Sequence, residues 1–204
     1  MNTEHLKQSL QRHKHLMLLA ALVGMCVVQP LAQGIFVGLV LFDAFLMFLL
    51  LGVFVVVFKR RHERQWAVAL AVPAIVAKWA AYGLPVDMQW MAIIAHHAFV
   101  LMFLAMAVAI ILRGVFEERT IESDHVIATV CGYLLAGVAW GNAYRIVDLL
   151  VPGAFSMKPE IVLQINDDHT RSFLFNYFSL STLTGTGYGD ITPIWPGVAS
   201  LTWM

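Results

Sequence analysis

Long apolar runs, each about as long as a membrane is thick, dominate this sequence. A membrane-spanning helix needs about 20 consecutive apolar residues. Of the 204 residues, 60% are hydrophobic and only 13% are charged. Soluble domains carry about 25% charged residues, so the composition indicates a membrane protein. Five runs are long enough to span, namely His15–Ala32, Ile35–Phe58, Trp66–Leu84, Met88–Leu112 and His125 to about Val147.

The charged residues predict the orientation of these spans and exclude some partners. Basic clusters precede the first span (Lys7 to Lys14) and follow the second (Lys59 to Arg64) and the fourth (Arg113 to Arg119). Cytoplasmic loops carry an excess of Lys and Arg, so we expect a multi-pass cell-membrane protein, in the plasma or bacterial inner membrane, with a cytoplasmic N-terminus. The net charge of zero argues against a nucleic-acid partner. Cys26 and Cys131 lack CxxC spacing, so neither a disulfide nor a zinc site is expected.

A glycine-rich motif stands near the end of the chain, at Thr184-Gly185-Thr186-Gly187-Tyr188-Gly189-Asp190. Glycines at alternate positions allow backbone conformations that other residues avoid. An aromatic-rich stretch of helical length, 172–183, precedes the motif, and Ile191-Thr192-Pro193 with a new apolar segment, 194–204, follows it. In composition and order, residues 171–193 resemble the pore loop of potassium channels. Residues 184–189, named the glycine segment below, then correspond to the selectivity filter.

The resemblance implies a fold and a function. The fold would be an all-α membrane protein, with a four-helix N-terminal bundle (1–122) and a pore module (123–204) of outer helix, pore helix, filter loop and incomplete inner helix. The function would be passive potassium conduction through a homotetramer in the lipid bilayer, with no enzyme activity and no cofactor. K⁺ would be bound by backbone carbonyls alone. The implied filter residues are Thr184, Gly185, Thr186, Gly187, Tyr188 and Gly189.

The motif departs from the family pattern at its inner end. Gly185 stands where the family usually has threonine, whose hydroxyl helps to shape the innermost ion site. We therefore expect weaker binding at that site and poorer ion discrimination. Thr186 stands where the family has Val or Ile and keeps the β-branch.

Four further residues are implied to support the filter: Asp190, Tyr177, Phe178 and Ser181. Tyr177 and Phe178 correspond to paired aromatics that brace the filter tyrosine. Phe178 has no polar group, so it can donate no hydrogen bond to Tyr188. Ser181 replaces a carboxylate found in some channels, so Asp190 is not expected to form a carboxyl pair.

The apolar segment that begins at residue 194 covers about three helical turns before Met204. The resemblance implies a full inner helix there, so we expect the sequence to be a truncated record of a longer protein. The alternative is a non-conducting or weakly selective channel-like subunit or fragment that lacks the inner helix. A remote alternative, an intramembrane enzyme, lacks a recognisable nucleophile or metal geometry.

Ionisable residues lie within three of the predicted spans: Asp43, Lys78, His96 and His97. At about 1.5 Å per residue they lie at similar depths, so an Asp43–Lys78 ion pair joined by one histidine is predicted. Its role would be structural, with proton sensing by a histidine as the alternative. The fourth span holds no Arg or Lys before Arg113, so voltage sensing by an Arg-rich fourth helix is not expected.

Two further features concern packing and the outer loop. Gly137 and Gly141, four residues apart, would let a neighbouring helix approach closely. Asp167-Asp168-His169 is expected to be a solvated outer loop, with a cation-concentrating acidic ring as the alternative.

Overall fold

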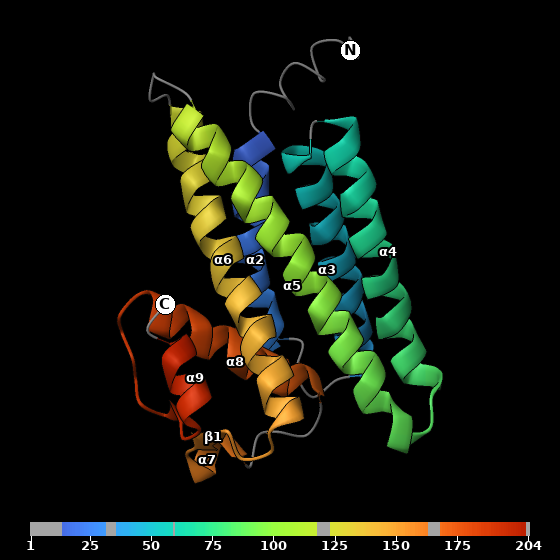
Figure 1. Cartoon of the computed structure of the whole chain (residues 1–204), viewed down its shortest axis with the longest axis vertical. Helices are drawn as coiled ribbons and strands as arrows, with labels where there is room; N and C mark the ends of the chain where they lie inside the picture. The colour runs from blue at the N-terminus through green and yellow to red at the C-terminus, as the bar shows by residue number, and fades with distance from the viewer. Residues whose placement is uncertain (1–13, 32–35, 59, 118–122, 163–167, 203–204) are drawn as a thin grey trace. The chain divides into compact units, whose positions relative to one another are not determined.

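The computed structural model describes residues 14–31, 36–58, 60–117, 123–162 and 168–202. These residues are mostly helical (Figure 1). The five long helices are α2 (Lys14–Leu31), α3 (Phe36–Val57), α4 (Arg61–Gly83), α5 (Val86–Glu117) and α6 (Ser123–Leu150). The shorter elements are β1 (Phe155–Met157), α7 (Pro159–Val162), α8 (Asp168–Leu183), β2 (Ile191–Pro193) and α9 (Pro196–Leu201).

Three helices of the described residues are long and apolar enough to cross a membrane, in agreement with the predicted membrane character. They comprise Arg61–Gly83, Asp87–Glu117 and Asp124–Leu150, which correspond to the third, fourth and fifth predicted spans. The first two predicted spans coincide with α2 and α3. Within the described residues these helices contribute the shorter apolar stretches His15–Met25 and Phe45–Val57.

The chain forms two compact units, which are described separately. The first contains residues 1–67 and 106–135, and the second contains residues 68–105 and 136–204. Helices α4, α5 and α6 each contribute residues to both units, so the units do not follow the predicted division at residue 122. The first unit is held by aliphatic packing, with Leu22 of α2, Val53 of α3 and Leu135 of α6 almost fully buried.

The second unit is built around an aromatic cluster. Burial of such large apolar rings is the main stabilising term in a small core. Phe155 lies 4.8 Å from Phe175 and 5.8 Å from Phe178 between ring centroids, and Tyr144 lies 5.1 Å from Phe178. The same core also contains Ala154, Leu174, Ile191 and Val198. The cluster therefore joins α6, β1, α8, β2 and α9 into one body.

The second unit also contains a two-stranded antiparallel sheet, which the all-α prediction did not include. Strand β1 pairs with β2 in the register Phe155 with Pro193, Ser156 with Thr192 and Met157 with Ile191. Next to it, the amides of Ile194 and Trp195 donate to the carbonyl oxygen of Ala154. The sheet thus ties the segment after α6 to the segment that follows the glycine segment, so that the chain between them forms a closed loop.

Candidate functional site

Helix α8 leads directly into the glycine segment. Its buried residues recur at helical spacing and form one face of the helix: Thr170, Leu174, Phe175, Phe178 and Ser179. Of these, Leu174, Phe175 and Phe178 belong to the aromatic cluster. The helix ends at Leu183, and Gly185 follows with a φ of +72°. A glycine in this left-handed conformation just after the last turn is a common helix stop.

The two glycines of α6 allow α8 to lie close against that helix. A Cβ atom added at Gly141 would lie 3.0 Å from the Cα of Asn176, and one added at Gly137 would lie 3.3 Å from Cγ of Leu180. The Ser179 hydroxyl also donates a 2.7 Å hydrogen bond to the carbonyl oxygen of Gly137. The close helix approach predicted from this glycine pair is therefore made by α8 of the same chain.

The backbone of the glycine segment alternates in handedness. Gly185, Gly187 and Gly189 have φ values of +72°, +51° and +67°, whereas Thr186 and Tyr188 between them have negative φ. An L-residue pays a steric penalty in the left-handed region, so these three positions require glycine. A threonine at 185 would be strained in this backbone. The local conformation therefore favours the glycine found at position 185, where the potassium-channel pattern has threonine.

Hydrogen bonds anchor the start of the glycine segment to the end of α8. The amides of Thr186 and Gly187 donate to the carbonyl oxygen of Ser181 at 2.9 and 3.1 Å, and the amide of Gly185 donates to that of Thr182 at 3.0 Å. The Thr184 hydroxyl donates to the carbonyl oxygen of Leu180 at 2.8 Å. These bonds satisfy carbonyls that a helix end otherwise leaves without partners. The position of the segment therefore depends on the position of α8.

The C-terminal end of the segment contacts Tyr177 of α8. Its ring stacks on that of Tyr188, with centroids 5.9 Å apart and planes 13° apart. Its hydroxyl donates a 2.7 Å hydrogen bond to Oδ2 of Asp190, whose Oδ1 accepts from the amide of Ile191. Partial burial, together with this bond to the Asp190 carboxylate, raises the pKa of Tyr177 to about 12.

The other two predicted support residues have different surroundings. Phe178 is buried in the aromatic cluster, and its described ring contacts are with Tyr144 and Phe155. The Ser181 hydroxyl donates to the carbonyl oxygen of Phe178, so this side chain is engaged within α8. Of the four predicted support residues, the described contacts thus bring Tyr177 and Asp190 together, and Tyr177 stacks on Tyr188 of the glycine segment.

The predicted intramembrane cluster is placed only in part. Nδ1 of His96 lies 2.9 Å from the carbonyl oxygen of Ala74 and therefore donates to it, which links α5 to α4. Lys78 is half-buried on α4 in the same unit. Asp43 belongs to the first unit, and its side chain lies outside the described residues, so its pairing with Lys78 stays a prediction.

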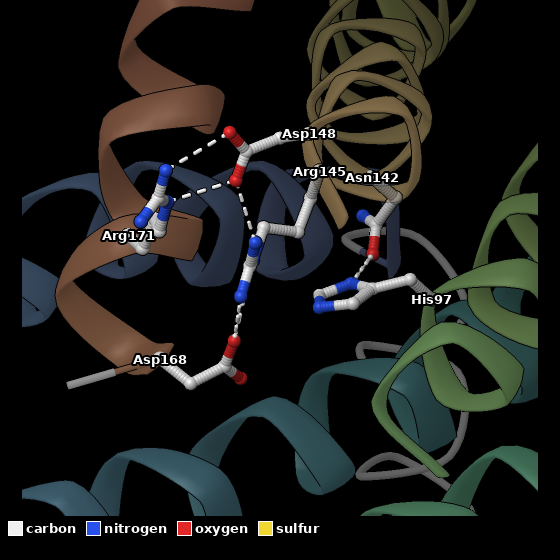
Figure 2. A network of polar contacts seen from close by, with 6 residues as sticks. All are labelled: His97, Asn142, Arg145, Asp148, Asp168 and Arg171. Atoms are coloured by element: carbon white, nitrogen blue, oxygen red, sulfur yellow. Dashed lines mark hydrogen bonds and ion pairs between the residues drawn. The ribbon is translucent and has the colours of Figure 1, made fainter. Parts of the chain in front are cut away.

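His97 is buried and pairs with α6. Its Nδ1 lies 2.7 Å from Oδ1 of Asn142, whose amide nitrogen donates to the carbonyl oxygen of Val138 (Figure 2). Because an amide oxygen can only accept, Nδ1 of His97 carries the proton of this bond. Nε2 of His97 is buried and has no hydrogen-bond partner among the described atoms. This geometry favours a neutral, structural histidine at position 97.

Four charged residues form a network between α6 and the first turns of α8 (Figure 2). We call Arg145, Asp148, Asp168 and Arg171 the charge cluster. Nε of Arg145 donates to Oδ1 of Asp168 at 3.2 Å, and its Nη1 donates to Oδ2 of Asp148 at 2.7 Å. Arg171 donates to both oxygens of Asp148, at 2.8 and 3.0 Å. Arg145 and Asp148 are almost fully buried. A buried charge is costly without a partner, and each of these charges has a bonded partner of opposite sign.

The expectation of a solvated outer loop is wrong for Asp168. This residue begins α8, and its side chain is 25% exposed. Burial alone, the largest single influence, would raise its pKa, but the neighbouring positive charges, Arg145 foremost, together outweigh burial and hold the pKa of Asp168 below its usual value of 3.8. His169, the next residue, lies with Nε2 3.1 Å from the hydroxyl of Tyr82. Asp167 lies outside the described residues.

The charge cluster was missed at the sequence level, although the sequence holds a trace of it. Arg145 and Asp148 are three residues apart, as are Asp168 and Arg171, with the order of charges reversed. Residues three apart share one face of a helix. If α6 and α8 had been expected to be neighbours, these two pairs of opposite order would have predicted that each arginine faces an aspartate of the other helix.

A cavity of about 610 Å³ lies in the first unit. Among its lining residues, Nδ1 of His15 lies 2.8 Å from Oδ2 of Asp124. The described residues that line it include no serine, threonine or cysteine. Among the described residues that line this cavity, the His–Asp pair therefore has no hydroxyl or thiol side chain to activate as a nucleophile.

No protein-family model, curated protein or solved structure matches this chain. The functional interpretation therefore depends on the glycine segment and on its surroundings.

Proposed function

We propose that this protein is a potassium-selective channel that conducts passively through a homotetrameric pore in a cell membrane. The observation that carries the proposal is the glycine segment, which directly follows a helix, has positive φ at every second residue and leads into Asp190 to complete the Thr-Gly-Tyr-Gly-Asp motif. A regular strand turns alternate carbonyls to opposite sides, whereas alternating handedness can turn successive carbonyls to one side. Carbonyls on one side can replace the water shell of a cation.

The surroundings of the segment support the same function. Helix α8 ends at the inner end of the segment, where the negative end of its dipole would favour a cation. One chain supplies one loop, so four copies arranged around an axis would be needed to surround an ion. Three apolar helices of spanning length are compatible with a membrane setting for such a pore.

Weak selectivity is a second candidate, favoured by Gly185. Without a side chain at this position, four threonine hydroxyls per tetramer are absent from the innermost ion site. The carbonyls would remain, so conduction would persist while discrimination between K⁺ and Na⁺ falls. An intramembrane enzyme is a weaker alternative, because no described observation favours it.

Flux measurements on the full-length protein in liposomes test the proposal. K⁺ and Na⁺ fluxes would be measured on one preparation of the wild type and of two alanine variants. Gly187→Ala places an L-residue at a φ of +51° within the segment, and Gly153→Ala places one at +84° in the turn after α6. A Cβ atom at either position meets nothing within 4 Å. Both variants therefore place an L-residue at positive φ without a new side-chain contact, and they differ in location.

The outcomes separate the candidates. The proposal predicts K⁺ flux well above Na⁺ flux in the wild type, blocked by barium, and lost in Gly187→Ala but retained in Gly153→Ala. Equal wild-type fluxes of the two ions would favour the weakly selective subunit. Absence of flux from an intact wild-type tetramer would contradict the proposal.

A further inference from the structure

The charge cluster links α6 to α8 twice, with opposite polarity. Arg145 of α6 donates to Asp168 of α8, and Arg171 of α8 donates to Asp148 of α6. The Arg171–Asp148 contact is bidentate, which fixes orientation as well as distance. The first turns of α8 are thereby held at two points, and the helix can neither rotate about its axis nor slide along α6 without breaking one of them.

The same helix carries the hydrogen bonds that hold the glycine segment. Ser181 and Thr182, whose carbonyls accept from the amides of residues 185–187, lie ten and eleven residues after Arg171. At 1.5 Å per residue, the first of these carbonyls is about 15 Å along the helix from Arg171. A small rotation at the start of α8 would therefore be transmitted to the amides of the segment.

We propose that the charge cluster is a positioning device for the glycine segment. It fixes the start of α8 so that the carbonyls at its end meet the amides of residues 185–187. The positioning itself is a property of the fold. Its effect on ion discrimination rests on the proposed function.

Arg171 is the member that can be removed most safely. Its side chain is 40% exposed, while those of Arg145 and Asp148 are 6% and 4% exposed. Without Arg171, the Asp148 carboxylate keeps its 2.7 Å bond from Arg145, so no buried charge is left without a partner. Arg171→Met therefore removes one of the two links between the helices and keeps the other.

Three variants of the full-length protein would be compared with the wild type. Arg171→Met removes the link, and Arg171→Lys restores the charge without the planar fork. Lys158→Met is the matched control, because Lys158 is an exposed cation of the same unit outside the cluster. Two quantities would be measured on folded protein: amide hydrogen exchange in peptides that cover residues 184–187, and the ratio of K⁺ to Na⁺ flux in liposomes.

The expected result is several-fold faster exchange and a several-fold lower K⁺/Na⁺ ratio in Arg171→Met, partial recovery in Arg171→Lys, and no change in Lys158→Met. Should Arg171→Met fail to assemble, Asp168→Asn weakens the other link with little change in shape and should give the same pattern. Amide hydrogen exchange at the wild-type rate in both Arg171→Met and Asp168→Asn would overturn the positioning role. If wild-type vesicles pass neither ion, the channel proposal fails, while the exchange data still decide whether the cluster positions the segment.

Discussion

The two ends of α8 are held by different kinds of interaction. Its first turns are fixed by charged side chains, through Asp168 and Arg171. Toward its last turn the helix is fixed by close packing against Gly137 and Gly141, and its final carbonyls accept backbone amides of the glycine segment. One end of the helix thus depends on side-chain chemistry, and the other depends on small residues and backbone geometry.

This difference has a physical reason. Ion pairs tolerate some displacement because the Coulomb energy falls only slowly with distance. Contact between a glycine and a neighbouring helix tolerates almost none, because a single added methyl group must displace other atoms. The two ends are therefore held in different ways, the first by directional hydrogen bonds between charged groups and the second by steric contact. We expect substitutions at the two ends to differ in size and in their dependence on pH.

The largest effect is expected at the charged end. Arg145→Leu leaves Asp168 without its guanidinium partner and Asp148 with only Arg171. Breaking a buried ion pair in this way typically costs about 3–5 kcal/mol. Thermal denaturation in detergent should show a large fall in the midpoint. Arg113→Leu, which removes an exposed arginine of α5, should leave the midpoint nearly unchanged; equal effects of the two substitutions would contradict the buried network.

The second effect concerns the packed end. Gly141→Ala would place a Cβ atom 3.0 Å from the Cα of Asn176, so the two helices must separate at a cost of about 1–3 kcal/mol. Gly137→Ala should cost less, because the atoms nearest its new Cβ belong to the end of the flexible Leu180 side chain. Gly52→Ala, where nothing lies within 4 Å, is the control and should be neutral or slightly stabilising. A ranking with Gly52→Ala as the most harmful would contradict this packing.

A smaller effect is expected from the bond that joins the packed faces. Ser179 is almost fully buried, and its hydroxyl donates to the carbonyl oxygen of Gly137 at 2.7 Å. Ser179→Ala should reduce the free energy of unfolding by about 1 kcal/mol. Ser200→Ala removes a similar 2.9 Å bond from an exposed serine to the carbonyl oxygen of Gly197 and should have little effect. Denaturation of both variants under the same conditions measures the difference.

The sequence predicted the parts of this structure that depend on local patterns. Helices α2 to α6 follow from apolar runs, because each run is itself long enough to define a helix. The helix before the glycine segment was predicted from residue 172, whereas α8 begins at Asp168. That first turn is stabilised by Arg145, a partner more than twenty residues away in sequence.

The features that were missed depend on pairs of segments. Strands β1 and β2 have three residues each, too few for a period-two pattern to stand out, and each is defined by the other. The position of Phe178 follows from the rings of Tyr144 and Phe155, which lie on two other segments. Such contacts are recognised only when the neighbours of a helix are known.

The smallest effect is expected from pH. It should distinguish two contacts of α8, the bond of Asp168 with Arg145 and the bond of Tyr177 with Asp190. The pKa of Asp168 is depressed in the folded state, so its contribution to stability is complete above its usual value of 3.8 and is lost only as the pH falls below that value. The pKa of Tyr177 is raised from 10.0 to about 12. Its contribution is complete below pH 10.0 and is lost as the pH rises toward 12.

The Asp168–Arg145 and Tyr177–Asp190 bonds should therefore both be intact between about pH 5 and 9. A spectrophotometric titration of the wild type, minus that of Tyr177→Phe, should show one tyrosine that ionises near pH 12. Asp190→Asn, which removes the carboxylate that accepts from Tyr177, should move this ionisation to lower pH. An unchanged titration in Asp190→Asn would mean that the bond between Tyr177 and Asp190 does not form in solution. The stacking on Tyr188 would then be the remaining described contact of the Tyr177 side chain with this end of the glycine segment.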